Sequence, residues 1–315
     1  MNYLFGGYPS VPTTGIVAAG LDHGRFSKPQ TLIKADYTTY FDSYNHVLAT
    51  IQKTAGKGGI GLYDHNGKLI QEIQESEKPA CYLCFSHDGR HLVTTNYHEG
   101  TAHIYAYDGQ LTLVKRLVFG DGAKMHCAWF DKTDQRLILS ALGLDQLIVL
   151  DHELNELKRI DFPKGSGVRH LVSDAQDHYL YAVSELSNEI FVIDLSDLSI
   201  VQQLSMLMDE TQPSAGAAIR LSKDGRHLYA STRGQDLIVH FHVMKNGQLE
   251  LDEIYHCNHQ TPRDFLLSED EKYMLIAYQD SDCIDSVALN ADMALRETVD
   301  TLKLPKIVCI KAFPQ

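Results

Sequence analysis

A repeat of 43 to 48 residues runs along this chain and limits the folds open to it. Its clearest copies read CYLCFSHDGRHLVTTNYHEGTAHIYAY from Cys81 and AAIRLSKDGRHLYASTRGQDLIVHFHV from Ala217. In both copies two alternating runs, rich in β-branched and aromatic residues, flank a DG turn, which is typical of two strands joined by a tight turn. No long segment keeps an apolar period of 3.6 residues, so we expect few helices.

The spacing of the repeat predicts a closed ring. The first apolar residue after each turn serves as an anchor, and the anchors are Leu48, Leu92, Leu137, Leu180, Leu228 and Met274. Counting one repeat length back from Leu48 reaches Leu4. Counting one repeat length forward from Met274 runs past Gln315 and, if the chain closes into a ring, returns to Leu4. The sequence therefore holds seven units. Units of ~40–50 residues with four short strands each indicate β-propeller blades. We therefore predict an all-β fold in which residues 1–315 form a single seven-bladed β-propeller domain with four-stranded antiparallel blades.

The two ends of the chain are expected to share one blade. The C-terminal KIVCIKAF, residues 306–313, resembles a first strand that stops where its turn should begin. The N-terminal YLFGGY resembles a second strand that lacks a first. Their pairing would close the ring, whereas an open array of β-sandwiches would not explain the near-constant spacing.

Composition excludes several function classes. The chain has 28 Lys and Arg against 41 Asp and Glu, and a net charge of -13 repels nucleic acid. No apolar run approaches the ~18–20 residues needed to cross a bilayer, and residues 1–10 lack the regions of a signal peptide. The six cysteines form no disulfide framework, and Cys81 and Cys84 of the CxxC point to opposite faces of a strand. We expect reduced thiols and a cytoplasmic protein with no membrane or nucleic-acid partner.

Two equivalent positions in the blades collect the titratable residues. In a propeller the first strand of each blade lines the central channel, and its start shares a face of the disc with the end of the second strand. The position eleven residues before the anchor holds Tyr37, Cys81, His126, Arg169, Ala217 and Arg263. The position five residues after the anchor holds Lys53, Tyr97, Leu142, Glu185, Arg233 and Gln279. We expect both sets at one mouth of the channel.

This mouth is predicted to bind a small anion. Buried charges are rarely unpaired, so an arginine cluster in an acidic protein calls for negative charge, and phosphate or carboxylate suits the guanidinium fork. Glu185 can pair with Arg169 or hold it in place, and His126 is a candidate general base. The alternative is a set of structural ion pairs around a wet channel.

Other histidines and motifs give weaker indications. His240 and His242 alternate on one strand and could share a metal ion, but no third ligand of fitting spacing is evident, so we predict no metal site. His170 follows Arg169 and is expected on the opposite side of that strand, either in the core or in support of a site residue. The absence of a GxSxG elbow argues against a serine esterase. No pattern specifies an oligomeric state.

Over essentially its whole length the chain resembles the lactonase family of seven-bladed propellers, which includes bacterial 6-phosphogluconolactonases and fungal carboxy-muconate cycloisomerases. The resemblance rests on YLFGGY, KPACYLCFSHDGRHLVTTNY, KMHCAWFD, GSGVRHLVSD with SELSNEIFVI, IRLSKDGRHLYASTRGQDLIVHF and TPRDFLLSEDEKYMLIAYQDSD. Two parts of this resemblance are more specific than the rest. One is the GSGxRHL block, which is followed by an EL pair sixteen residues after its Arg, and the other is the STR ending.

The resemblance implies a cytoplasmic enzyme of carbohydrate metabolism, in the pentose phosphate pathway, that hydrolyses a phosphorylated sugar lactone without cofactor or metal. It assigns catalysis to four residues: His126, Arg169, Glu185 and Arg233. Substrate binding is expected from four more: Arg263, Lys124, Tyr97 and Gln279.

In the implied mechanism Arg169 polarises the lactone carbonyl and His126 takes a proton from the attacking water. Glu185 orients Arg169 or is itself the base, while Arg233, Arg263 and Lys124 hold the phosphate.

The chain departs from the family pattern at three places. The family often has HPH where this chain has Lys124, Met125 and His126, so Lys124 replaces the first His. It often has NEL where this chain has Ser184 before Glu185, and an Asn-Glu pair where this chain has residues 50–53.

Two other functions stay open. A cycloisomerase would use the same cations for a dicarboxylate, and a non-enzymatic scaffold would bind a protein at loops on one face. The single tryptophan, Trp129, lies in a strand expected to be buried, which gives the scaffold little support.

Overall fold

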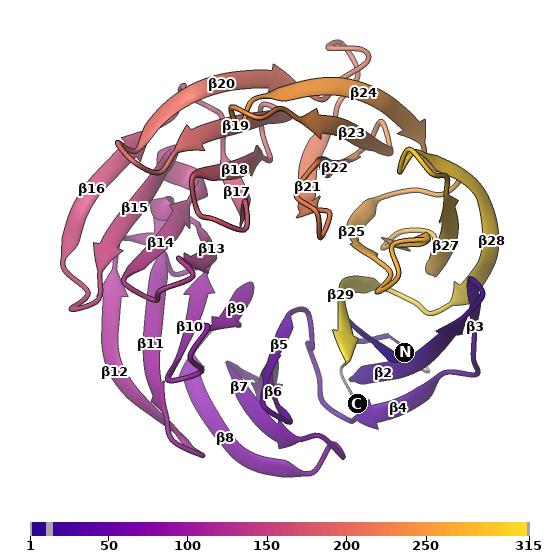
Figure 1. The fold of residues 1–315 in the computed structure, drawn as a ribbon. Coiled ribbons are helices and arrows are strands. Elements are labelled where there is room, and N and C mark those ends of the chain that lie inside the picture. Colours follow the sequence, from indigo (N-terminus) through magenta and orange to yellow (C-terminus); the bar gives the residue numbers. More distant parts are fainter. Residues whose placement is uncertain (1, 11–14, 314–315) are drawn as a thin grey trace.

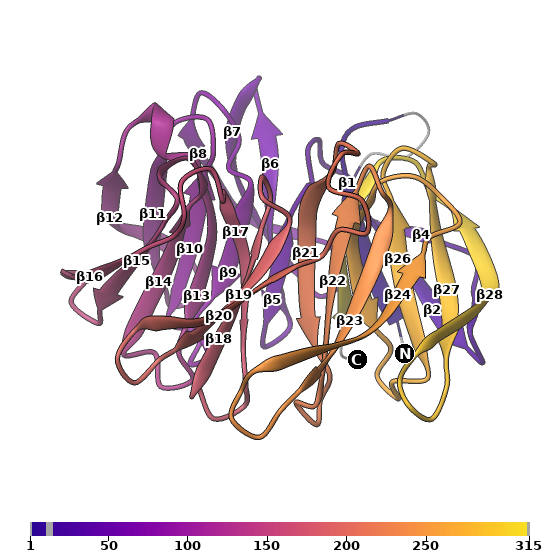
Figure 2. The same ribbon diagram turned by 90° about the horizontal axis from the view of Figure 1, so that it is seen from above.

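The structure is a computed structural model that describes residues 2–10 and 15–313. In these residues 29 strands form seven antiparallel sheets around a central axis (Figure 1). Figure 2 shows the disc edge-on, with the strands running between its two faces. This arrangement confirms the predicted seven-bladed propeller.

The blades follow one another along the chain. Blade 1 contains β29 (Ile307–Phe313), β1 (Asn2–Gly7), β2 (Ile16–Asp22), β3 (Arg25–Phe26) and β4 (Gln30–Ile33). Blade 2 contains β5 (Phe41–Tyr44), β6 (Val47–Thr54), β7 (Lys57–Asp64) and β8 (Leu69–Ser76). Blade 3 contains β9 (Tyr82–Phe85), β10 (His91–Asn96), β11 (Thr101–Tyr107) and β12 (Leu111–Val118). Blade 4 contains β13 (Met125–Phe130), β14 (Arg136–Ala141), β15 (Gln146–Asp151) and β16 (Glu156–Asp161).

The remaining three blades have the same pattern. Blade 5 contains β17 (Val168–Ser173), β18 (Tyr179–Ser184), β19 (Glu189–Asp194) and β20 (Ser199–Ser205). Blade 6 contains β21 (Ala215–Leu221), β22 (His227–Arg233), β23 (Leu237–Val243) and β24 (Leu249–His256). Blade 7 contains β25 (Pro262–Leu267), β26 (Tyr273–Tyr278), β27 (Cys283–Leu289) and β28 (Leu295–Lys303). Two short 3-10 helices, η1 (Asp121–Ala123) and η2 (Leu142–Leu144), flank strands of blade 4. In the described part of the chain no helix has the length and apolar character to cross a bilayer.

The DG turns explain why the repeat is visible in the sequence. In blade 3, Asp88 Oδ1 accepts hydrogen bonds from Ser86 Oγ at 2.8 Å and from the Arg90 backbone N–H at 2.9 Å. Gly89 has a φ of 71°, in the left-handed region that glycine adopts without strain. The turn at Ser222 and Asp224 repeats these contacts in blade 6. Each turn leads into the second strand of its blade, and the second residue of that strand is the buried anchor.

The core lies between neighbouring blades. One cluster of buried residues joins blades 5 and 6 through side chains such as Val192 and Val239, and another joins blades 4 and 5 through Leu147 and Phe191. Each such side chain contributes about 1.5–3 kcal/mol when it leaves water. The outermost strands are mostly exposed, because they lie at the rim of the disc; β12 and β16 each bury one residue, Leu111 and Ile160.

The two ends of the chain close the ring as predicted. β29 pairs with β1 in antiparallel register, with Leu4 opposite Lys311 and Phe5 opposite Ile310. Figure 1 shows β29 on the channel side of blade 1. Ile310 is fully buried in a cluster that joins blade 1 to blade 7. The last strand is therefore the innermost strand of the first blade.

Candidate active site

A β-bulge recurs near the start of the innermost strands. In β13, β17 and β25 the pairing with the second strand skips one residue, and the skipped residues are His126, Arg169 and Arg263. β29 skips Val308 in the same way. A bulge bends a strand and re-aims one side chain. The position eleven residues before the anchor thus corresponds to a bulge whose side chain enters the channel.

These bulged residues meet at a cavity of about 90 Å³ at one end of the channel. His126, Arg169, Arg263 and Val308 line it, and Tyr37 and Cys81 come from the equivalent position of blades 2 and 3. The other lining residues are Tyr8, Thr39, Tyr40, Pro79, Ala80, His98 and His170. Six blades thus contribute to one opening, although their residues are far apart in the sequence.

An ion-pair cluster of Arg169, Glu185 and Arg233 stands beside the cavity; Arg169 is buried and lines it, whereas Glu185 and Arg233 are half-buried and do not line it. Arg169 Nε donates a hydrogen bond to Glu185 Oε2 at 2.9 Å, and Arg233 Nη2 lies 3.1 Å from the same oxygen. Backbone carbonyls hold both guanidinium groups, because Arg169 Nη1 donates to Ala217 O at 2.5 Å and Arg233 Nη2 to Gly216 O at 2.9 Å. Both arginines are therefore fixed before any ligand arrives.

Burial and mutual repulsion set the protonation of this cluster. Burial, with repulsion from Arg169, lowers the pKa of Arg233 to about 10, so it stays charged at neutral pH. Burial alone would raise the pKa of Glu185, but the guanidinium groups of Arg169 and Arg233 hold it below its usual range. The cluster accordingly contains a carboxylate and charged arginines.

Arg263 adds a cation without its own carboxylate. It donates to Gln279 Oε1 at 3.1 Å, and none of the carboxylates in the described residues lies within ion-pair distance of it. The structure therefore places Gln279 against Arg263 rather than on the cavity wall.

His126 is the candidate base nearest these cations. Its side chain is buried, and Nδ1 has no hydrogen-bond partner among the described residues. Burial, together with Arg169 and Arg263, holds the pKa of His126 well below its usual range. The imidazole is therefore neutral at pH 7 and can accept a proton.

Two other predicted substrate-binding residues lie behind His126. The Tyr97 ring packs edge-on against the His126 ring at 6.2 Å, and Lys124 Nζ lies 5.5 Å from the Tyr97 ring centroid. Lys124 has a φ of 48° directly after η1. Neither residue lines the cavity, but Tyr97 packs against two residues that do, His98 and His126.

The expectation that His170 faces the opposite side of the strand from Arg169 is wrong. Its ring lies 5.1 Å from the His126 ring and on the cavity wall, and Arg169 Nη1 lies 3.2 Å from its Nε2. The bulge at Arg169 inserts an extra residue, so two successive side chains turn toward the channel instead of alternating. Burial and the Arg169 charge hold the pKa of His170 well below its usual range.

The comparison of equivalent positions in the blades does not reach every lining residue. Tyr8, His98 and Tyr40 fall outside the two compared positions. Tyr37 belongs to the first position, and the Lys53 ammonium of the second position lies 3.9 Å above its ring. The comparison of equivalent positions in the blades therefore identifies the pair of Tyr37 and Lys53 from the sequence.

The fold and this cluster define a propeller with a cationic pocket at one end of its channel. The family model described as "Lactonase, 7-bladed beta-propeller" matches residues 2–312, so the chain belongs to that family. The family resemblance seen in the sequence is confirmed.

Two comparisons at full length support the assignment. The chain is 26% identical to a 6-phosphogluconolactonase of Bacillus subtilis, over 98% of this chain and 97% of the relative. A crystal structure of a protein from Lactobacillus plantarum is 26% identical, with a TM-score of 0.90 and 98% of both chains covered. The structure of a periplasmic gluconolactonase of Pseudomonas aeruginosa, at 23% identity with 98% of both chains covered and a TM-score of 0.91, shows the shared fold.

Proposed function

We propose that this protein hydrolyses the lactone ring of a phosphorylated sugar acid, as a 6-phosphogluconolactonase does. The observation that carries the proposal is a group of three arginines with one carboxylate: Arg169 and Arg263 line the cavity, while Glu185 and Arg233 lie behind Arg169. Arg169, Arg233 and Arg263 with Glu185 leave two positive charges uncompensated. A phosphate monoester carries about -1.5 to -2 at pH 7, which matches this excess.

The proposed reaction uses the protein's own residues. Water attacks the lactone carbonyl carbon as the neutral imidazole of His126 accepts one of its protons. Arg169 donates to the oxygen that becomes negative in the tetrahedral intermediate. The carbonyl re-forms, the ring C–O bond breaks, and the ring oxygen takes the proton from the His126 imidazolium. The new carboxylic acid then loses its proton to solvent.

Glu185 has a positioning role in this proposal. Its carboxylate already accepts a hydrogen bond from Arg169 and faces Arg233, so it fixes the direction of both guanidinium groups. Arg233 and Arg263 remain to hold the phosphate, with Lys124 as a more distant cation. The depressed pKa of His126 makes it a weak base, which suffices because lactones of this kind open readily in water.

The test is turnover of purified protein on freshly generated 6-phosphogluconolactone, measured against the spontaneous rate, with gluconolactone and a carboxy-muconolactone in parallel. The proposal expects the phosphorylated lactone to be opened fastest. Turnover of the muconolactone alone would replace it with a cycloisomerase. No turnover of any lactone, together with a co-purifying protein, would favour a binding scaffold.

The cytoplasmic location stays a prediction from the sequence.

A further inference from the structure

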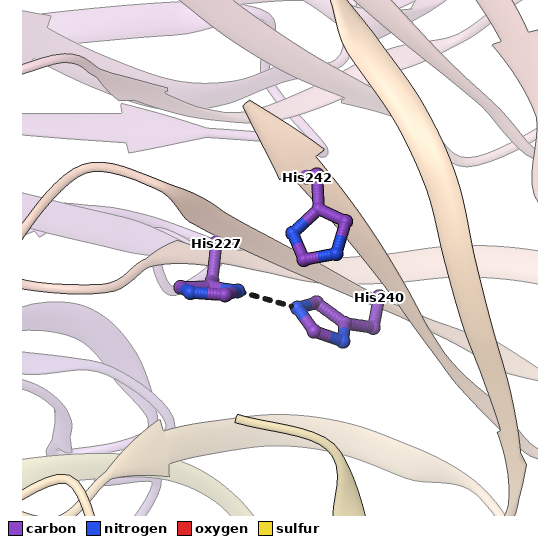
Figure 3. A group of neighbouring side chains, drawn as sticks. All are labelled: His227, His240 and His242. Atoms are coloured by element: carbon purple, nitrogen blue, oxygen red, sulfur yellow. Dashed lines mark hydrogen bonds between the residues drawn. The ribbon is translucent and has the colours of Figure 1, made fainter. Parts of the chain in front are cut away.

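A second polar cluster lies in blade 6, away from the cavity. His227 and His242 are directly opposite each other in the pairing of β22 with β23, and His240 lies two residues before His242 on the same face. Figure 3 shows the three imidazole rings turned toward one another. The sequence offers no evident third ligand for His240 and His242, and the cross-strand pairing supplies it.

The rings are close enough to share one ion. His227 Nδ1 and His240 Nε2 lie 3.0 Å apart, and one nitrogen of each of the three rings lies within 4.8 Å of the others (Figure 3). Two nitrogens that bind a tetrahedral zinc ion at ~2.0–2.1 Å are about 3.3 Å apart. Small rotations of the rings would therefore bring them to ligand distance.

A carboxylate stands behind the rings. Asp252 Oδ2 lies 3.0 Å from His240 Nδ1, and Asp252 Oδ1 lies 3.3 Å from His242 Nε2. β24 has a bulge here, because His240 pairs with Glu253 while Phe241 pairs with Leu251, and Asp252 is the residue skipped. A carboxylate on the outer nitrogen of a histidine is the usual support for a metal ligand.

The environment keeps the rings ready to bind. His227 and His240 are buried, His240 stacks on Tyr229 at 4.5 Å, and His242 is 43% exposed, which leaves a path from solvent.

We propose that His227, His240 and His242 form a binding site for a late first-row divalent cation such as Zn²⁺, with Asp252 orienting the rings. Three imidazoles suit zinc, copper and nickel rather than calcium or magnesium. The site is distinct from the candidate active site, because His227 begins β22 and Arg233 ends it, about 20 Å apart along the strand. A bound ion would tie β22 to β23 and would not take part in lactone opening.

The test is zinc binding by the full chain after treatment with EDTA, using ZnCl₂ in equilibrium dialysis and elemental analysis. One equivalent of zinc per chain and a higher melting temperature are expected for the unmodified protein. His242→Ala should weaken binding about tenfold or more. His65→Ala is the matched control, because it removes one ring of an exposed pair, with His46 at 5.8 Å. It should leave zinc binding unchanged.

Two results would overturn the site: no zinc retained by the unmodified protein, or equal zinc binding by His242→Ala. If His242→Ala does not fold, Asp252→Asn replaces it and must also weaken binding. The Co²⁺ form should show the intense visible absorption of a four-coordinate site. Lactone turnover, if present, should be the same with and without zinc, so failure of this site and failure of the proposed activity are separate outcomes.

Discussion

Arg169 donates to Glu185 across 2.9 Å, although the two residues are sixteen apart in the sequence. Arg169 is near the start of β17 and Glu185 directly follows the end of β18, so the hairpin of blade 5 brings them to one face of the disc. Arg233 reaches the same carboxylate from blade 6. One acidic residue thus aligns two cations from neighbouring blades beside the cavity.

Replacing Arg169 tests the centre of this arrangement. Arg169→Ala removes the donor assigned to the developing oxyanion, so we expect kcat to fall about 100- to 1000-fold while the circular dichroism spectrum stays unchanged. Arg159→Ala is the control, because Arg159 pairs with Glu156 on the exposed outer strand of blade 4. Equal activity of both variants would rule out the role given to Arg169.

Arg263 tests the recognition of phosphate. Arg263→Ala should raise KM for 6-phosphogluconolactone about 10- to 100-fold, the usual loss of one charged hydrogen bond, and change KM for gluconolactone little. Arg296→Ala, which removes a cation paired with Glu253 on an outer strand, should change neither constant. A parallel rise in KM for both lactones would contradict phosphate binding by Arg263.

The pH profile tests His126 as the base. The imidazole must be neutral to accept a proton, and burial with the Arg169 charge holds the pKa of His126 well below 6.5. Activity should therefore persist as the pH falls through 6.5 and decline only at lower pH. The measurement is kcat/KM for gluconolactone, corrected for spontaneous opening, because this substrate has no phosphate to titrate. An inflection at or above pH 6.5 would be incompatible with this assignment.

The closing strand predicts a stability effect. Ile310 is fully buried between blades 1 and 7, so Ile310→Ala should lower the free energy of unfolding by about 2–5 kcal/mol. Leu113→Ala, at a half-exposed position of β12, should cost much less. Chemical denaturation of both variants gives the comparison, and equal losses would show that β29 does not hold the ring shut.

Much of the site follows from counting along the sequence. The anchors are the second residues of the second strands in blades 2 to 7, so a fixed offset reaches the bulged residues His126, Arg169 and Arg263 without any knowledge of bulges. Val308 occupies the equivalent position of blade 1, but it lies at the other end of the chain from its anchor Leu4. Only the ring closure relates the two.

Other features need the register of the strands. His170 enters the cavity because the bulge before it breaks the alternation that places successive residues on opposite faces. His227 joins His242 because these residues are paired across β22 and β23, fifteen positions apart in the sequence. Neither relationship leaves a periodic mark in the sequence.

The most direct test of the central claim is a crystal structure of the protein with 6-phosphogluconate, the expected product. The phosphate should contact Arg233 and Arg263, and the carboxylate should lie between Arg169 and His126. A product molecule bound on another surface, with the channel mouth unchanged at saturating concentration, would contradict the claim that this cavity opens phosphorylated lactones.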